Sequence, residues 1–109
     1  METIENNYKE RDYEVHIRFP EFTCLCPKTG QPDFAEITIR YTPDARLVEL
    51  KSLKMYLNAY RNEGIFHEEA VNRILEDFVA AVTPKQVEIT GTFNVRGGIY
   101  TTVTASYPP

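Results

Sequence analysis

Alternating apolar and polar residues predict two β-strands in the first part of the chain. Between Tyr13 and Phe19 the apolar side chains occupy every second position, and we expect Pro20 to end that strand. The same alternation runs from Ala35 to Tyr41, and the TPDA sequence that follows is typical of a turn. The pattern therefore predicts a β-hairpin whose strands are joined by a long connection.

Two helices are predicted in the middle of the chain. The segment from about Ser52 to Asn62 is rich in helix-forming residues, and Gly64 stands where we expect the helix to stop. A second helix is predicted from about His67 to Val82, closed by Thr83-Pro84. Its apolar residues recur at helical spacing: Ala70, Val71, Ile74, Leu75, Phe78 and Val82.

Two more strands are predicted near the end of the sequence. Apolar residues alternate over 87–95 and again over 99–103, on either side of an Arg-Gly-Gly turn. The order ββααββ predicts an α+β fold, an antiparallel sheet with both helices on its apolar face. Residues 1–11 are polar and lack an apolar period, so we expect a flexible N-terminal tail, followed by a single domain over 12–109.

The second face of the predicted sheet is polar, and both of its edges are open. The residues expected on that face are Glu14, His16, Arg18, Glu88, Thr90, Thr92 and Asn94. An open strand edge favours pairing with another strand. Joining several sheets edge to edge into a ring would remove these edges, so the pattern predicts a homo-oligomer.

Composition narrows the classes of molecule that the protein is expected to bind. The 109 residues carry a formal net charge of −4, whereas proteins that bind phosphate backbones usually present a basic face. We therefore expect no direct nucleic-acid binding. No apolar run is long enough to span a membrane, and the N-terminus lacks the pattern of a signal peptide. We expect a cytoplasmic protein with reduced thiols and no membrane contact.

Both cysteines lie in one segment, FTCLCPKTGQPDFA, residues 22–35. Zinc takes about four ligands; Cys24 and Cys26 supply two, and His16 and His67 are isolated, so we predict no metal site. A disulfide between the two cysteines would close a very small ring, with its Cα atoms near the upper limit for bridging. For Cys24 we favour packing in the core, the usual fate of a free cysteine.

Cys26 has different neighbours. It precedes Pro27 and Lys28 at the start of an irregular loop, where a nearby cation can favour the thiolate. The turn suggested by residues 29–32 could return Asp33 to it. A thiolate beside a carboxylic acid is a nucleophile with a proton donor, so Cys26 and Asp33 are candidate catalytic residues. Burial as a small apolar group is the alternative.

A second candidate site begins the first helix, in ELKSLK, residues 49–54. Lysines near a helix N-terminus oppose the macrodipole unless an anion binds there. Lys51 and Lys54, with free backbone N–H groups, are therefore candidate phosphate ligands, and a solvated basic turn is the alternative. Glu49 is suited either to accept two N–H donors from a planar heterocycle or to pair with a lysine.

The remaining polar candidates lie at the start of the second helix and in the last turn. The helix dipole alone explains acidic residues after His67, although a buried Glu68 would suit the paired donors of a guanine-like edge. Arg96 fits a simple hairpin turn and is also a candidate for a second phosphate contact. No dinucleotide-binding glycine motif follows a strand.

These motifs occur together in one known family. FTCLCPKTGQPDFA, VELKSLKMY, RNEGIFHEE and RGG, in that order, closely resemble the short single-module 7-cyano-7-deazaguanine reductases of queuosine biosynthesis. The resemblance runs from about Phe19 to about Gly98. It implies a tunnelling fold, whose sheets assemble into a barrel in rings stacked in pairs, with active sites between subunits.

The resemblance also implies the reaction and the roles of individual residues. The family reduces a deazapurine nitrile to the primary amine of 7-aminomethyl-7-deazaguanine with two NADPH. By position, Cys26 corresponds to the nucleophile of the LCP motif and Asp33 to the proton donor. The other implied positions are Val48, Glu49, Leu50, His67 and Glu68 for substrate, and Lys51 and Lys54 for cofactor, with Arg96 as a further cofactor candidate.

In the implied mechanism, Cys26 adds to the nitrile carbon and forms a covalent thioimide, which accepts a hydride more readily than the nitrile does. Two alternatives stay open. A sister enzyme on the same fold forms an amidine from this nitrile in transfer RNA; it would share Cys26 and Asp33, but the ELKSLK sequence argues against it. A non-catalytic ligand-binding protein would need neither residue.

Overall fold

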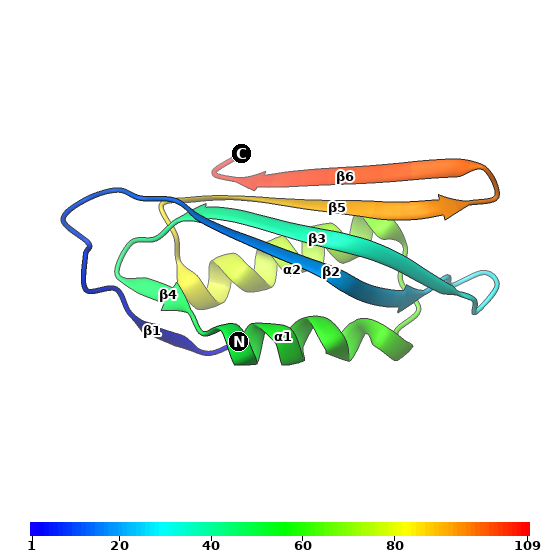
Figure 1. The fold of residues 1–109 in the computed structure, drawn as a ribbon, viewed down its shortest axis with the longest axis horizontal. Coiled ribbons are helices and arrows are strands. Elements are labelled where there is room, and N and C mark those ends of the chain that lie inside the picture. The colour runs from blue at the N-terminus through cyan, green and yellow to red at the C-terminus, as the bar shows by residue number, and fades with distance from the viewer.

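The computed structural model describes all 109 residues, and its main sheet has four antiparallel strands (Figure 1). These are β2 (Val15–Leu25), β3 (Pro32–Thr42), β5 (Gln86–Arg96) and β6 (Ile99–Tyr107), which lie side by side in that order. A second, two-stranded sheet pairs β1 (Thr3–Glu5) with β4 (Arg46–Val48). The predicted antiparallel sheet is confirmed, with one small sheet in addition.

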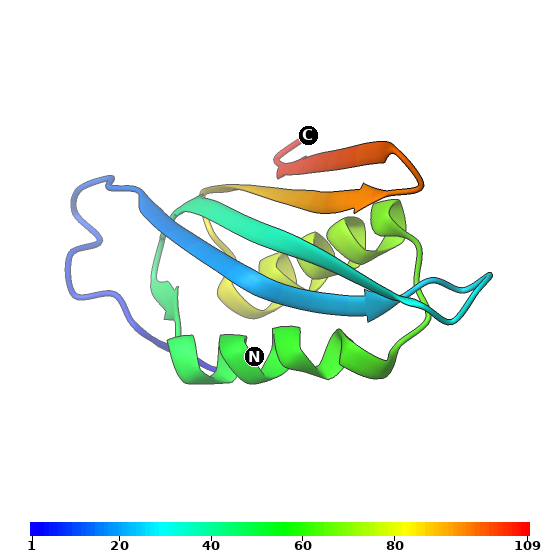
Figure 2. The same cartoon turned by 45° about the vertical axis from the view of Figure 1, so that its right-hand side comes forward.

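Two helices lie on the same side of the main sheet, as Figures 1 and 2 show from two directions. Helix α1 (Leu50–Asn58) continues into a 3₁₀ turn, η1 (Ala59–Asn62), which packs against β2. Helix α2 (His67–Val82) packs against β5 and β6. The predicted α+β class is confirmed. No helix is both long and apolar enough to cross a bilayer.

The core lies between the helices and the apolar face of the sheet. Nineteen buried apolar residues form one cluster, in which the rings of Tyr41 and Phe78 meet edge to face at 4.9 Å. Gly91 of β5 allows α2 to approach closely, because a Cβ there would lie 2.7 Å from Val71 Cγ2. The alternation that predicted the strands is therefore the pattern that fills the core.

Strand β2 is longer than predicted. Pro20 does not end it; the strand continues to Leu25 after a register shift between Phe19 and Phe22. Because β2 is an edge strand, the missing N–H of proline breaks no ladder hydrogen bond. The helical turns end at Asn62, as predicted, and Gly64 beyond them forms a parallel bridge with Leu25.

Secondary structure at the N-terminus was also missed. The predicted loose tail contains β1, which pairs with β4 in antiparallel register. Asn6 is buried: its side chain donates to the Asp44 carbonyl and accepts from the Tyr13 hydroxyl at 2.6 Å. The first six residues therefore pack on the domain, and the proposed boundary at residue 12 stays a prediction.

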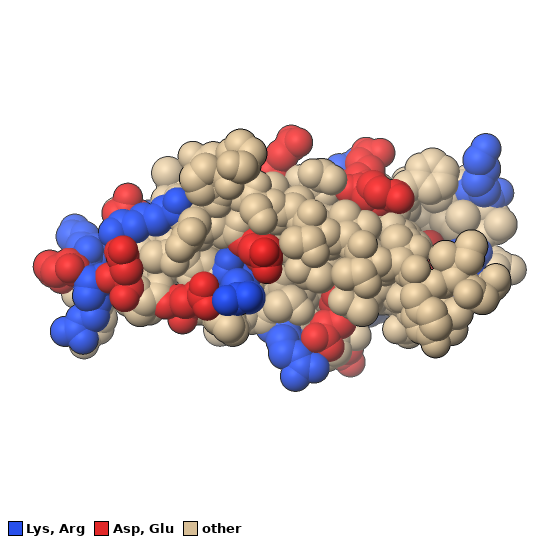
Figure 3. Space-filling model, turned by 90° about the horizontal axis from the view of Figure 1, so that it is seen from above, with Lys and Arg blue, Asp and Glu red and all other residues tan.

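The second face of the sheet carries ion pairs between opposite charges rather than a surface of a single charge sign. Arg18 pairs with Glu36 at 2.9 Å, and Arg40 pairs with Glu14 at 3.1 Å. Figure 3 shows acidic and basic side chains interleaved in its view of the molecule. This face is polar, as predicted.

Candidate active site

Three segments meet at one end of the sheet, on the right in Figure 1: the β2–β3 loop, the start of α2 and the β5–β6 turn. We call this the cysteine end. The segments line an open cavity of about 320 Å³. The residues that line it are Cys26, Pro27, Thr29, Asp33, Phe66, His67, Glu68, Arg96, Ile99 and Thr101. Five of the predicted site residues therefore share one cavity.

A tight turn holds Cys26 at the cavity. Its N–H donates to the Gln31 carbonyl, and the Gly30 N–H donates to the Cys26 carbonyl, both at 2.8 Å. Gly30 has a φ of 72°, which glycine adopts without strain. Hydrogen bonds from the Thr29 hydroxyl and from the N–H groups of Thr29 and Lys28 lower the pKa of the Cys26 thiol. The turn therefore favours the thiolate.

Asp33 is buried beside the cavity with both carboxylate oxygens engaged. Oδ2 lies 3.2 Å from His67 Nε2, and Oδ1 pairs with the Arg96 guanidinium. The His67 ring stacks on Phe93, with centroids 3.7 Å apart and an angle of 6° between planes. Arg96 also donates to the Thr29 hydroxyl at 2.7 Å and to the Gln31 side chain at 2.9 Å. The two candidate catalytic residues, Cys26 and Asp33, are therefore set in a continuous hydrogen-bond network.

Cys24 lies directly opposite Asp33 in the β2–β3 register, but it is fully buried among apolar side chains. Burial raises the pKa of the Cys24 thiol to about 11. The prediction that Cys24 packs in the core is confirmed. The two cysteines therefore have opposite environments although they are two residues apart.

The other predicted site residues gather at the opposite end of the sheet, where α1 begins (Figure 1). We call this the lysine end; it comprises Val48, Glu49, Leu50, Lys51 and Lys54. Val48 is buried and Leu50 is exposed. Lys51 and Lys54 are exposed, and neither takes part in an ion pair.

Glu49 corrects part of the predicted phosphate site. Its carboxylate caps α1, accepting from the Lys51 N–H at 2.9 Å and from the Ser52 N–H at 2.8 Å. These hydrogen bonds lower the pKa of Glu49. Two of the backbone N–H groups predicted to be free for an anion are therefore occupied, and the side chains of Lys51 and Lys54 remain available.

A single chain does not bring the two ends together. Residues 50–62 form α1 and η1, and Gly64 beyond them bridges Leu25, the last residue of β2 before the β2–β3 loop. At about 1.5 Å per helical residue, roughly 20 Å separate Lys51 from that loop. The arrangement also leaves Glu68 exposed, so the burial that would suit recognition of a guanine-like edge is absent within one chain.

Sequence reasoning missed several residues of the cavity. Thr29 and Gln31 were noted only as turn formers, although both contact Arg96. Phe66 and Ile99 are exposed apolar side chains on the cavity wall, 49% and 67% accessible. Their place beside a thiol depends on segments far apart in the chain, and no local signal marks it.

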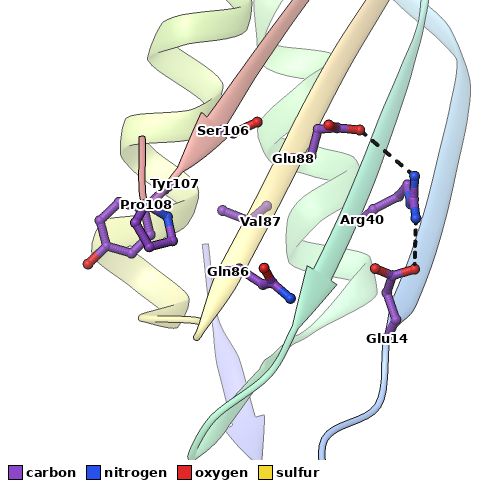
Figure 4. A pocket seen from close by; sticks show the side chains of 8 residues that line it. All are labelled: Glu14, Arg40, Gln86, Val87, Glu88, Ser106, Tyr107 and Pro108. Atoms are coloured by element: carbon purple, nitrogen blue, oxygen red, sulfur yellow. Dashed lines mark hydrogen bonds and ion pairs between the residues drawn. The ribbon is translucent and has the colours of Figure 1, made fainter.

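A second cavity, of about 210 Å³, lies on the polar face of the sheet (Figure 4). Arg40 is directed at both Glu14 and Glu88, at 3.1 and 3.9 Å, so its charge is already balanced. The structure contains no cluster of three or more His, Cys, Asp or Glu side chains placed to hold a metal ion. The cysteine end is therefore the stronger candidate for chemistry.

Chemically, the cysteine end combines a thiol with a lowered pKa, a buried carboxylate and an exposed carboxylate at a cavity. This set allows nucleophilic addition to an electrophile, coupled to movement of a proton. Residues 32–109 match the family model described as "QueF-like protein". The chain belongs to the QueF-like family.

Relatives of this QueF-like chain include proteins named "NADPH-dependent 7-cyano-7-deazaguanine reductase". Those of Thioalkalivibrio sulfidiphilus, Thermomicrobium roseum and Nitrosomonas europaea are 59%, 58% and 57% identical over 107 residues. The match covers 98% of this chain and 83%, 84% and 77% of theirs. The resemblance inferred from the motifs is confirmed.

A solved structure also resembles this QueF-like chain. The apo form of "the archaeosine synthase QueF-Like" matches with a TM-score of 0.76 at 26% identity, covering 87% of this chain and 91% of that one. The fold is thus shared between proteins named for different reactions. The function therefore has to be assigned from the residues of the site rather than from the fold.

Proposed function

We propose that this chain is an NADPH-dependent reductase that converts the nitrile of 7-cyano-7-deazaguanine to the amine of 7-aminomethyl-7-deazaguanine. The observation that carries the proposal is Cys26: its thiol pKa is lowered, and it shares a cavity with Asp33. Relatives 57–59% identical over nearly the whole chain bear the name of this enzyme. The product belongs to queuosine biosynthesis.

In the first step, the Cys26 sulfur forms a bond to the nitrile carbon, and one π bond of the nitrile opens. The thiol loses a proton and the nitrile nitrogen gains one, so the thioimide forms with no change in oxidation state. We assign the transfer of that proton to Asp33, which lies beside the cavity. In the resting chain its oxygens are held by His67 and Arg96, so one of these contacts must loosen for the proton to pass.

Substrate recognition is assigned to the start of α2. Glu68 presents an exposed carboxylate at the cavity, which can accept paired N–H donors from a deazaguanine ring. Phe66 and Ile99 supply apolar surface for the planar ring. His67 is fixed by its stacking on Phe93. At the lysine end, we assign Val48, Glu49 and Leu50 to the substrate as well.

The residues present suit NADPH. Lys51 and Lys54 are three residues apart on α1, so their ammonium groups lie on one side of the helix, and both lack a carboxylate partner. We assign them to the phosphates, with Arg96 as a further candidate. NADPH, when bound, supplies hydride, and a nitrile needs two hydrides and two protons to become a primary amine.

The separation of the two ends supports an oligomer. Because α1 and η1 hold Lys51 roughly 20 Å from the end of β2, a site that uses both ends takes one end from each of two chains. Both edge strands, β2 and β6, are open, and Leu50 and Ile4 expose apolar surface beside the lysine end. We propose rings of subunits, stacked in pairs, whose sheets form a barrel. We propose that the substrate is a small molecule and that neither nucleic acid nor a membrane is a direct partner. We propose the cytoplasm as the place where the protein acts.

Intact mass spectrometry tests the proposal. Wild-type protein mixed with 7-cyano-7-deazaguanine should gain the full mass of the substrate, and added NADPH should be oxidised at two equivalents per amine formed. No adduct on wild-type protein would overturn the proposed nucleophile and favour a binding protein. An adduct without NADPH oxidation would favour the amidine-forming reaction of the archaeosine synthase class.

A further inference from the structure

The hydroxyl of Thr29 lies three residues after Cys26 in the same turn and accepts from Arg96, and all three residues line the cavity. We propose that Thr29 is a positioning residue, which Arg96 orients so that its hydroxyl proton is directed at the Cys26 sulfur. This inference rests on the proposed role of Cys26 as the nucleophile. It assigns to Thr29 a function beyond its part in forming the turn.

The argument starts from the capacity of a hydroxyl group, which has one proton to donate and two lone pairs to accept with. Arg96 Nη2 donates to Thr29 Oγ1 at 2.7 Å, and the Gln31 backbone N–H donates to the same oxygen at 3.2 Å. Guanidinium and amide N–H groups have no acceptor, so Thr29 must accept in both contacts. Its own proton is then the one left for the neighbouring sulfur.

Arg96 is held firmly enough to impose this orientation. It pairs with Asp33 Oδ1 and donates to the Gln31 side-chain oxygen at 2.9 Å, in addition to its contact with Thr29. The turn fixes the other partner, because the Cys26 N–H donates to the Gln31 carbonyl at 2.8 Å. Donation from Thr29 is also the largest of the effects that lower the pKa of Cys26.

Other charged or titratable groups lie around the same thiol, and none of them is removed when Thr29 is changed. They are Asp33 on β3, Arg96 on β5, His67 and Glu68 on α2, and Lys28 in the loop, with Cys24 buried on β2. A variant at Thr29 therefore isolates the hydroxyl from the rest of the electrostatic environment.

The test measures the rate at which iodoacetamide alkylates Cys26 between pH 5 and pH 10, followed by intact mass. Thr29→Val removes the hydroxyl at nearly constant volume, Thr29→Ser keeps it, and Thr92→Val is a matched control on the exposed face of β5. We expect the profile of Thr29→Val to move to higher pH, with a rate at pH 7 reduced about three- to tenfold, because a donor to the thiolate is lost. Thr29→Ser and Thr92→Val should follow the wild type.

An unchanged profile in Thr29→Val, or an equal change in Thr29→Ser, would overturn the inference. Because Cys24 is fully buried, its alkylation reports a misfolded variant, and only chains that leave Cys24 unlabelled are scored. Nitrile adduct formation by the wild type is measured in parallel. A missing adduct would contradict the proposed function, whereas the alkylation profiles decide the role of Thr29 in either case.

Discussion

The two ends of the sheet differ in whether their charged side chains find hydrogen-bond or ion-pair partners within one chain. At the cysteine end, Asp33 is buried with both oxygens engaged, and Arg96 contacts three side chains. At the lysine end, Glu49 caps a helix, while Lys51 and Lys54 are exposed without a carboxylate partner. The comparison indicates that one chain holds the candidate reacting groups by its own contacts, whereas the two lysines are left open to a ligand or to a second chain.

The largest effect on activity is expected from removing the proposed nucleophile, Cys26. Cys26→Ala should abolish the nitrile adduct and lower NADPH-dependent reduction by about a thousandfold or more, because the thioimide cannot form. Cys24→Ala is the matched control; it removes a buried thiol and should keep the adduct. An adduct that survives in Cys26→Ala and disappears in Cys24→Ala would reverse the assignment of the two cysteines.

A smaller loss of adduct-forming rate is expected when Asp33, the proposed proton-transfer group, is changed. Asp33→Asn should slow adduct formation about a hundredfold, which is typical for the loss of a general acid or base. The measurement is the rate of adduct formation in a single turnover without NADPH. Glu76→Gln, which changes an exposed carboxylate of α2, should leave this rate unchanged. Equal rates in Asp33→Asn and the wild type would remove Asp33 from the mechanism.

Changing the lysine end should separate cofactor binding from adduct formation. Lys51→Ala combined with Lys54→Ala should raise the KM for NADPH about tenfold or more, because each loses a charged contact to phosphate. Adduct formation without NADPH should keep its wild-type rate. Lys9→Ala, an exposed lysine outside both ends, is the control. A KM unchanged by the double substitution would assign the phosphates to other residues.

The smallest expected effect is a difference in reactivity between the two thiols of the wild-type protein. The pKa of Cys26 is lowered and that of Cys24 is raised to about 11, so near pH 8 only Cys26 has an appreciable thiolate fraction. Iodoacetamide should therefore label the native chain once at pH 8, at Cys26, and twice after denaturation. The rate should rise with pH as more thiolate forms. Labelling at both cysteines in the native chain would contradict the burial of Cys24.

Local patterns predicted much of this fold. The bounds of α2 follow from apolar spacing and the Thr83-Pro84 stop, and the structure has the helix over the same residues, His67–Val82. Strand β1 was missed because three residues are too short to show an alternation. The continuation of β2 past Pro20 depends on its place at the sheet edge, which is a property of the assembled sheet.

Local patterns also predicted part of the site. Cys26 and Asp33 lie seven residues apart, so turn chemistry was enough to suggest that they meet near one cavity. The pairing of Asp33 with Arg96 joins residues 63 positions apart, and no local pattern signals it. Glu49 is not among the usual N-cap residues, so its cap on α1 was not predicted either.

The claim that the cysteine end of one chain works with the lysine end of another has a direct test. Chains carrying Cys26→Ala are mixed with chains carrying Lys51→Glu and Lys54→Glu, unfolded and refolded together, and NADPH oxidation with 7-cyano-7-deazaguanine is measured. Each variant alone should be inactive. If each site takes one end from each of two chains, random assembly gives about one quarter of the sites two intact ends, with activity to match. A mixture no more active than its two parents would contradict the shared site.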